Sequence, residues 1–187
     1  MARKRENRRS RHMRKVFLVI CEGETEETYI DFLRQSFRSP IKIVTKISGT
    51  EISKRKIDQY RNDLKIYGNE VIETFLMYDM DVPAIVNKLK QLNAELLLSN
   101  PCIELWFLLH CVEVHTEVSS TECFKRLITS HSVWSNYQKP ILSLKQRELL
   151  WSNKEVAILR ACDLAEFSNP SSSIFKLLNR LKRSDNT

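Results

Sequence analysis

Apolar runs of strand length alternate with amphipathic segments through the first half of the chain. Residues 16–21 (VFLVIC) form a continuous apolar run, which is typical of a strand buried on both faces of a parallel sheet. Further strands are predicted at 41–47, 73–78 and 95–99, and the alternation in 41–47 indicates a position near a sheet edge. Helices are predicted between and after these strands, over about 24–37, 51–67, 83–92 and 100–112. Strands that alternate with helices imply right-handed crossovers and an α/β fold with a parallel sheet of about four strands.

The second half lacks comparable strand patterns, and residues 119–183 are predicted to be helical. Ser119 and Glu122 have the spacing of a capping box, and the last helix is expected to begin at Asn169-Pro170-Ser171. Asn100 is expected to cap the helix that enters at Pro101. The predicted organisation is a basic arm over 1–15, an α/β core over 16–115 and a helical extension over 116–187 that packs on the core.

The amino-acid composition excludes several classes of function. The 187 residues are 42% hydrophobic, which suits one buried core, and no apolar run is long enough for a predicted membrane span. The three glycines, Gly23, Gly49 and Gly68, lie far apart, which excludes a Walker-type phosphate loop and a dinucleotide fingerprint. Five scattered cysteines without a C-x-x-C pair or a signal peptide favour reduced thiols and a cytoplasmic location.

The net charge of +7 is concentrated at the N-terminus. Residues 1–15 carry eight basic side chains and one acid, while the remainder has equal numbers of acidic and basic residues. Such a block repels itself and is expected to be disordered alone, and its charge favours contact with nucleic acid. A solubilising or partner-binding tail is the alternative. The residues predicted to contact nucleic acid are Arg5, Arg8, Arg9, Arg11, Arg14 and Lys15.

Acidic residues follow two of the predicted strands. Glu22 ends the first strand and Glu26 lies one turn later, while Asp79 and Asp81 follow the third. Ligands of open parallel sheets bind at the carboxyl ends of the strands, where these four side chains are expected to meet. Packed carboxylates repel one another unless cations lie between them, and oxygen ligands suit Mg²⁺ or Mn²⁺. Two such ions would stabilise the attacking and leaving oxygens of a phosphodiester.

Structural roles are the alternative for each of these acids. Asp81 fits an N-cap for the helix entered at Pro83, and Asp79 fits a turn residue. The glutamates at 24, 26 and 27 also suit a helix N-terminus. A zinc site built from His110, Cys111, His115 and Cys123 matches no familiar ligand spacing. The apolar side chains around Trp106 and Phe107 are predicted to be core packing, and His110 a core histidine.

Four blocks of the chain resemble the RloB family. They are C-E-G-x-T-E at 21–26, Asp79-x-Asp81, S-N-P-C-x-E-x-W at 99–106, and Asn169-Pro170-Ser171. The resemblance covers nearly the whole chain. It implies a topoisomerase–primase (Toprim)-like fold, a role in anti-phage abortive infection, and an AAA-type ATPase partner of the RloA kind.

The resemblance also implies roles for individual residues. Glu22, Glu26, Asp79 and Asp81 would be metal ligands for Mg²⁺ or Mn²⁺, with Glu22 doubling as general acid or base. Glu104 would face the same cleft, and Lys176 would offset phosphate charge. The activity expected is metal-dependent hydrolysis of RNA, tRNA included, or DNA. Oligomerisation within a larger complex stays open.

Two other functions stay open from the sequence. The chain could be a non-catalytic regulatory subunit that docks on the ATPase through its arm and helical extension. It could also carry out nucleotidyl transfer in priming at a Toprim-like site.

Overall fold

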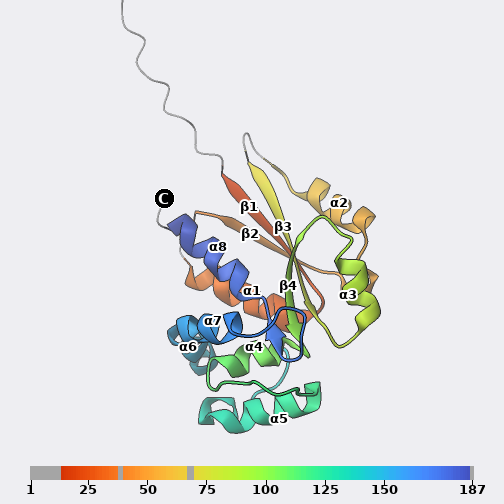
Figure 1. The fold of residues 1–187 in the computed structure, drawn as a ribbon. Helices are drawn as coiled ribbons and strands as arrows, with labels where there is room; N and C mark the ends of the chain where they lie inside the picture. The colour runs from red at the N-terminus through yellow and green to blue at the C-terminus, as the bar shows by residue number, and fades with distance from the viewer. Residues whose placement is uncertain (1–13, 38–39, 67–69, 186–187) are drawn as a thin grey trace, which may run out of the picture.

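The computed structural model describes residues 14–37, 40–66 and 70–185, and it forms a three-layer α/β/α arrangement (Figure 1). The strands are β1 (Lys15–Cys21), β2 (Lys42–Ile47), β3 (Val71–Asp79), β4 (Glu95–Asn100) and β5 (Ser171–Ser172). The helices are α1 (Glu24–Ser36), α2 (Lys54–Asp63), α3 (Pro83–Leu89), α4 (Ile103–Leu109), α5 (Ser120–Ser130), α6 (Leu144–Ser152), α7 (Lys154–Cys162) and α8 (Phe175–Asp185), with short 3-10 turns at Gly49–Glu51 and Ser132–Trp134.

The sheet has the strand order β2-β1-β3-β4-β5. The pairings β1–β2, β1–β3 and β3–β4 are parallel, and β4–β5 is antiparallel. Cys21 lies opposite Ile47 and Met77, and Asp79 lies opposite Ser99, so the carboxyl ends of the parallel strands share one edge. The predicted α/β fold, its parallel sheet and the edge position of β2 are therefore confirmed.

The two faces of the sheet bury separate apolar clusters because successive strand residues point to opposite faces. Phe17, Val19 and Met77 face the larger cluster, which includes α1 and the helices of the second half of the chain. Leu18 and Leu76 face a smaller cluster beneath α2 and α3. The buried strand β1 is thus apolar at every position after Lys15, as its continuous run predicts.

The C-terminal helices pack on the core. The larger apolar cluster runs without interruption from β1 to Leu181 in α8, across the predicted boundary at 115/116. Phe107 of α4 stacks on Trp134, with 5.6 Å between ring centroids and an interplanar angle of 9°. Aromatic burial of this kind joins the two halves into one core. Across the described residues, no helix is both long and apolar enough to cross a membrane.

Three boundary predictions are wrong. Residues 169–171 do not begin a helix, because Ser171 and Ser172 pair with Asn100 and Ser99 as the short strand β5. Asn100 ends β4 and does not cap α4, since the N-cap is Cys102 and the helix begins at Ile103. The helix predicted over 51–67 is shorter, because a 3-10 turn precedes it and the Ser53 hydroxyl caps α2 by accepting a hydrogen bond from the Lys56 N–H.

Candidate functional site

Glu22 and Asp79 lie side by side at the carboxyl edge of the sheet. The Glu22 N–H donates to the Met77 carbonyl at 2.9 Å, which continues the ladder one residue beyond β1. The Glu22 Oε2 atom then accepts a hydrogen bond from the Asp79 N–H at 3.0 Å. The two acids that end neighbouring strands are therefore joined directly.

Asp79 also fixes the start of α4. Its Oδ1 atom accepts a hydrogen bond from the Ile103 N–H at 2.8 Å. Cys102, the N-cap of α4, supplies no side-chain cap, so the aspartate on β3 satisfies this helix donor instead. The contact brings the next residue of α4, Glu104, into the same region.

Glu26 approaches from the first turn of α1. Its Oε2 atom accepts a hydrogen bond from the Gly23 N–H at 3.0 Å, so the glutamate side chain folds back on the N-terminus of its own helix. A Cβ atom on Gly23 would lie 3.3 Å from this oxygen, which is a tight contact. Glycine at position 23 thus lets the carboxylate lie against the backbone.

Glu104 completes the group and is fully buried. Its Oε1 atom accepts a hydrogen bond from the Tyr137 hydroxyl at 3.1 Å and forms an ion pair with Lys139 Nζ at 2.9 Å. Its Oε2 atom is buried without a hydrogen-bond partner. A buried carboxylate oxygen without a partner is costly, which marks this position as one where a donor or cation would be stabilising.

The electrostatics show how closely the four acids lie. Burial, with the charges of Glu26, Glu104 and Glu22, raises the pKa of Asp79 to about 9. Burial also raises the pKa of Glu22 and that of Glu26, although backbone N–H groups partly offset both shifts. Lys139 acts in the opposite direction on Asp79 and Glu22. Glu22, Glu26, Asp79 and Glu104 are called the acidic cluster below.

The donor chemistry of the acidic cluster fits a hard divalent cation. The contacts described above use one oxygen of each carboxylate, which leaves the other for a ligand. Carboxylate oxygens are the ligands that Mg²⁺ and Mn²⁺ take. In this conformation, no three His, Cys, Asp or Glu side chains within the described ranges converge on one ion position. Side-chain rotation would therefore have to accompany binding.

The structure brings together three of the four acids predicted from the strand ends, with Glu104. Asp81 lies on an exposed bend beyond β3. Its charge raises the pKa of Glu22, so it is near the rim of the acidic cluster. It does not cap the next helix, because the N-cap of α3 is Val82.

The predicted nucleic-acid contacts lie elsewhere or outside the described residues. Lys15 is the first residue of β1, at the opposite end of the strand from the acidic cluster, and pairs with Glu73 at 2.7 Å. Lys176 in α8 pairs with Glu166. Arg14 is exposed just before β1. Arg5, Arg8, Arg9 and Arg11 lie outside the described residues.

Tyr137 and Lys139 are the residues that sequence reasoning missed. Both lie between Trp134 and α6, in the half of the chain predicted to be only a helical extension. Neither residue belongs to a sequence motif whose spacing indicates catalysis or ligand binding. Only their position in the fold brings them to the site.

The region around Trp106 forms core, as predicted. Trp106 is fully buried and donates a hydrogen bond from Nε1 to the Tyr29 hydroxyl at 2.7 Å. The Nδ1 atom of buried His110 lies 2.8 Å from the Trp106 carbonyl. Burial lowers the pKa of His110 to about 4, so the ring is neutral at physiological pH.

Fold and site together define an α/β protein with acids gathered at the carboxyl edge of a mainly parallel sheet. The family model described as RloB-like protein matches residues 17–181, and the chain belongs to this family. Comparisons with curated proteins and with solved structures found no match.

Proposed function

We propose that the chain is a metal-dependent nuclease that hydrolyses phosphodiester bonds in RNA or DNA. The observation that carries the proposal is the acidic cluster, in which Asp79 and three further carboxylates from separate segments lie together. A carboxyl with a pKa of about 9 is costly to ionise without a cation, and such perturbed groups are concentrated at functional sites. Membership of the RloB-like family supports an effector role in anti-phage defence, with an RloA-type ATPase as partner in the cytoplasm.

Glu22, Glu26 and Asp79 would hold Mg²⁺ or Mn²⁺, with Asp81 at the rim and Glu104 beneath. The bound ion would supply Lewis-acid stabilisation of the phosphorane-like charge. Glu22 is only partly buried, and its raised pKa suits a general acid or base that exchanges a proton with the attacking water or leaving oxygen. Lys139 is exposed over nearly half of its side chain and would face the phosphate while it holds Glu104 in place.

The basic arm would retain the nucleic acid strand. It joins β1 at Lys15, whereas the acidic cluster lies at the other end of the sheet. Seven strand residues at about 3.3 Å each separate the two by roughly 20 Å. Thirteen residues, the length of segment 1–13 of the arm, can extend about 45 Å, which is enough to follow a strand toward the site.

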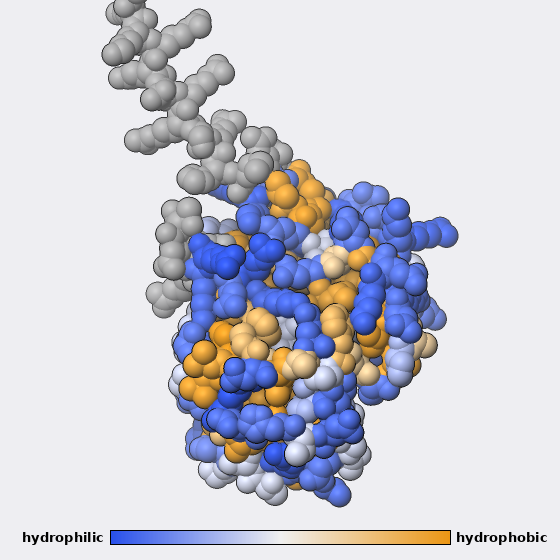
Figure 2. Space-filling view, viewed as in Figure 1, coloured by the Kyte–Doolittle hydropathy of each residue, from blue (hydrophilic) through white to orange (hydrophobic). Residues whose placement is uncertain are grey.

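A regulatory subunit is the second candidate, and an apolar patch on α7 favours it. Val156 and Leu159 are one helical turn apart and are 44% and 67% exposed. Figure 2 shows apolar surface over this helix. The patch would dock on the ATPase, and the carboxylates would then serve only the structural contacts already described.

The experiment compares cleavage by wild type, Glu22→Gln and Asp79→Asn with Mg²⁺ or Mn²⁺ on matched RNA and DNA. Glu148→Gln is the control, because Glu148 is exposed on α6 and makes none of the contacts of the acidic cluster. The nuclease proposal expects a loss of at least 100-fold in both cluster variants and none in the control. Equal cleavage by all four proteins contradicts the catalytic assignment. Primers formed from nucleoside triphosphates would instead indicate nucleotidyl transfer.

Mn²⁺ binding gives a second readout that needs no substrate. Titration followed by electron paramagnetic resonance should show binding to wild type and to Glu148→Gln, with affinity reduced at least tenfold in Asp79→Asn. Absent Mn²⁺ binding with intact association to the ATPase would favour the regulatory subunit.

A further inference from the structure

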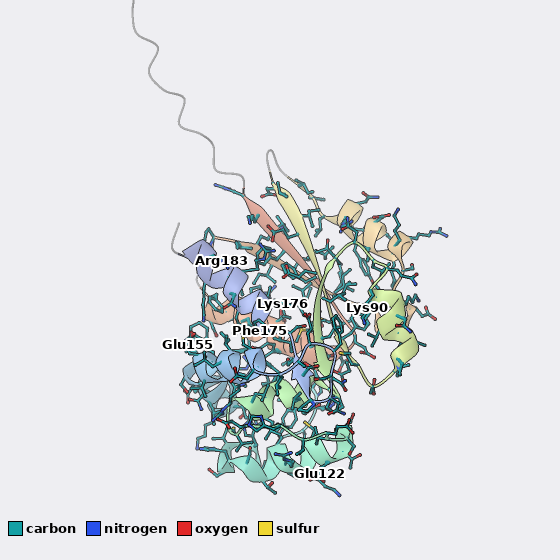
Figure 3. The ribbon with its side chains drawn as sticks, viewed as in Figure 1. Lys90, Glu122, Glu155, Phe175, Lys176 and Arg183 are labelled. Carbon is teal, nitrogen blue, oxygen red and sulfur yellow. The ribbon has the colours of Figure 1, made fainter. Side chains whose placement is uncertain are left out.

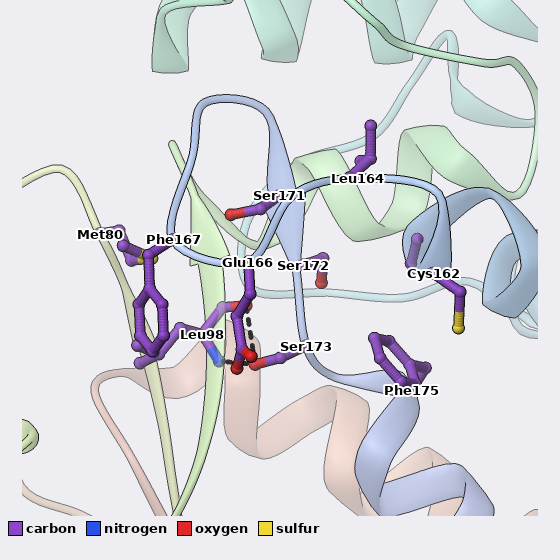
Figure 4. Close-up of a pocket in the computed structure, with 11 residues that line it drawn as sticks. Met80, Leu98, Cys162, Leu164, Glu166, Phe167, Ser171, Ser172, Ser173 and Phe175 are labelled. Atoms are coloured by element: carbon purple, nitrogen blue, oxygen red, sulfur yellow. Dashed lines mark hydrogen bonds between the residues drawn. The ribbon is translucent and has the colours of Figure 1, made fainter.

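A cavity of about 180 Å³ lies beside the β4–β5 pairing, enclosed by the loop after α7 and the start of α8 (Figure 4). Apolar side chains form much of its wall, with Phe167 and Phe175 from the two flanking segments (Figure 4). Sites for drug-sized ligands begin at roughly 300 Å³, so this cavity suits a single planar ring system.

Phe167 adopts a backbone conformation that is unfavourable for a phenylalanine. Its φ angle is 65°, in the left-handed region that favours glycine. The residue is 41% exposed, so full burial does not offset the strain. The Nζ atom of Lys90, at the C-terminus of α3, lies 4.0 Å from the ring centroid of Phe167 and contacts one face of the ring. Strained residues of this kind are concentrated at ligand sites.

Among the residues that line the cavity, Glu166 carries the one carboxylate. The hydroxyls of Ser171, Ser172 and Ser173 already bond to backbone carbonyls or to another serine. Glu166 lines the cavity and lies between Phe167 and Phe175 in the close-up view (Figure 4). One of its oxygens pairs with Lys176, which follows Phe175 at the start of α8 (Figure 3).

We propose that this cavity binds an unpaired guanine base of the nucleic acid strand. The inference rests on the proposed nuclease function and names the substrate feature that the site selects. Aromatic side chains stack on unpaired bases, and phenylalanine rings stand on the wall here. The carboxylate and the ammonium group at Glu166 and Lys176 then read the edge of the base.

Guanine matches this pair of charges. Its Watson–Crick edge presents two neighbouring N–H donors, which a carboxylate accepts together, beside an O6 acceptor for a lysine. Adenine and cytosine each place a ring nitrogen acceptor next to their amine, and uracil has one N–H between two acceptors. Each of these bases would set an acceptor against the Glu166 carboxylate.

The cavity and the acidic cluster share the end of β3. Met80 lines the cavity, and it lies between Asp79 and Asp81 in sequence. Its N–H donates to the Ser99 carbonyl at 2.9 Å, so the backbone here is held against β4. A base in the cavity would therefore place its own phosphodiester at the edge where the acidic cluster lies.

Methionine methyl signals provide the test. The chain has four methionines, of which Met80 lines the cavity and Met77 is buried on the other face of β3. Full-length protein labelled with ¹³C at the methionine methyls is titrated with GMP, AMP, CMP and UMP in EDTA. We expect GMP to shift the Met80 signal and not that of Met77, with affinity at least tenfold above the other three nucleotides.

Two variants form a matched pair. Glu166→Gln should reduce GMP affinity at least tenfold, because the amide has one acceptor oxygen and an NH₂ donor in place of the two carboxylate oxygens. Glu155→Gln is the control, since Glu155 also pairs with a lysine of α8, Lys182, but lies outside the cavity (Figure 3). Backbone spectra of both variants check that the fold is retained.

The outcomes separate this proposal from the nuclease assignment, because no metal or cleavage is involved. An unshifted Met80 signal with all four nucleotides overturns the base site even if the protein cleaves RNA. Equal shifts with all four, or equal GMP affinity in Glu166→Gln and wild type, overturn the recognition of guanine. A Met80 shift specific to GMP that Glu166→Gln loses supports the site whether or not cleavage is seen.

Discussion

Glu104 and Lys139 form an ion pair, with 2.9 Å between Oε1 and Nζ, although the helix α5 separates them in the sequence. The glutamate side chain is 1% exposed and the lysine side chain 47%. Burial alone would lower the pKa of Lys139, but Glu104 more than offsets this and raises it. The segment before α6 is thus tied electrostatically to the carboxyl edge of the sheet.

Loss of Lys139 should destabilise the fold through the carboxylate left behind. Lys139→Ala is expected to cost about 1–3 kcal/mol, below the value for a fully buried pair because the lysine is half-exposed. Adding Glu104→Gln should recover part of the lost free energy of unfolding. Urea unfolding of the wild type, the two single variants and the double variant measures this recovery. Lys145→Ala, at an exposed site on α6, is the control. Equal losses in the two lysine variants would show that the pair contributes nothing.

Asp79 should make the metal-free protein less stable as the pH rises. Its pKa is about 9 in the folded chain against an ordinary 3.8, so between these values the unfolded state is ionised while the folded state keeps the proton. Stability therefore falls with rising pH across this window. Asp79→Asn should raise the melting temperature in EDTA at pH 8 by several degrees, and the difference should shrink toward pH 4. A difference that is constant with pH would contradict the assignment.

Divalent cations should reverse this effect in the wild type. A ligand at 100 times its Kd stabilises a protein by about 2.7 kcal/mol. Mg²⁺ or Mn²⁺ should therefore raise the melting temperature of wild type at pH 8 and leave Asp79→Asn nearly unchanged. NaCl at the same ionic strength controls for screening by salt. Equal shifts of the melting temperature in both proteins would show that the ion binds outside the acidic cluster.

His110 should make the protein sensitive to acid. Burial lowers its pKa to about 4 from an ordinary 6.5, and nearby Arg160 adds to the shift. Between these values the unfolded chain binds a proton that the folded chain does not, so stability is lost as the pH falls. The melting temperature of wild type should drop between pH 6.5 and 4, and His110→Phe should drop less. Parallel curves would assign the acid sensitivity to other groups.

The basic arm should contribute to binding and not to the fold. Deletion of residues 1–13 leaves Lys15 of β1 paired with Glu73 of β3. The melting temperature should therefore stay within about a degree or two of wild type. Affinity for single-stranded RNA at low salt should fall, and the slope of log K against log salt should decrease by roughly 0.7 for each phosphate that the arm no longer neutralises. Fluorescence anisotropy at several salt concentrations measures both. Unchanged affinity would assign the arm to partner docking.

The sequence predicts most of the sheet because each strand carries its own pattern. The run at 16–21 is apolar at every position, and it becomes the inner strand β1, between β2 and β3. Asn100 shows the limit of local signals, since its side chain suits an N-cap but its backbone continues β4. The two-residue strand β5 has no pattern of its own and exists because β4 offers a partner edge.

The candidate site is only partly visible in the sequence. Glu22 and Asp79 follow recognisable strands, so the shared edge of a parallel sheet brings them together. Glu104 is predicted as a site residue only through the resemblance to the RloB family. Tyr137 and Lys139 reach it through tertiary packing of an irregular segment, which no periodicity encodes.

The antiparallel pairing of Ser171 and Ser172 with β4 has a consequence for biosynthesis. The Leu98 N–H donates to the Ser173 hydroxyl at 2.8 Å, so an inner strand of the sheet waits for a residue 75 positions later in the chain. A ribosome-bound chain can pair β1, β2 and β3 early, yet its β4 edge stays open until residues 171–173 have been synthesised. Premature termination before residue 171 would release an aggregation-prone fragment with an unprotected β4 edge.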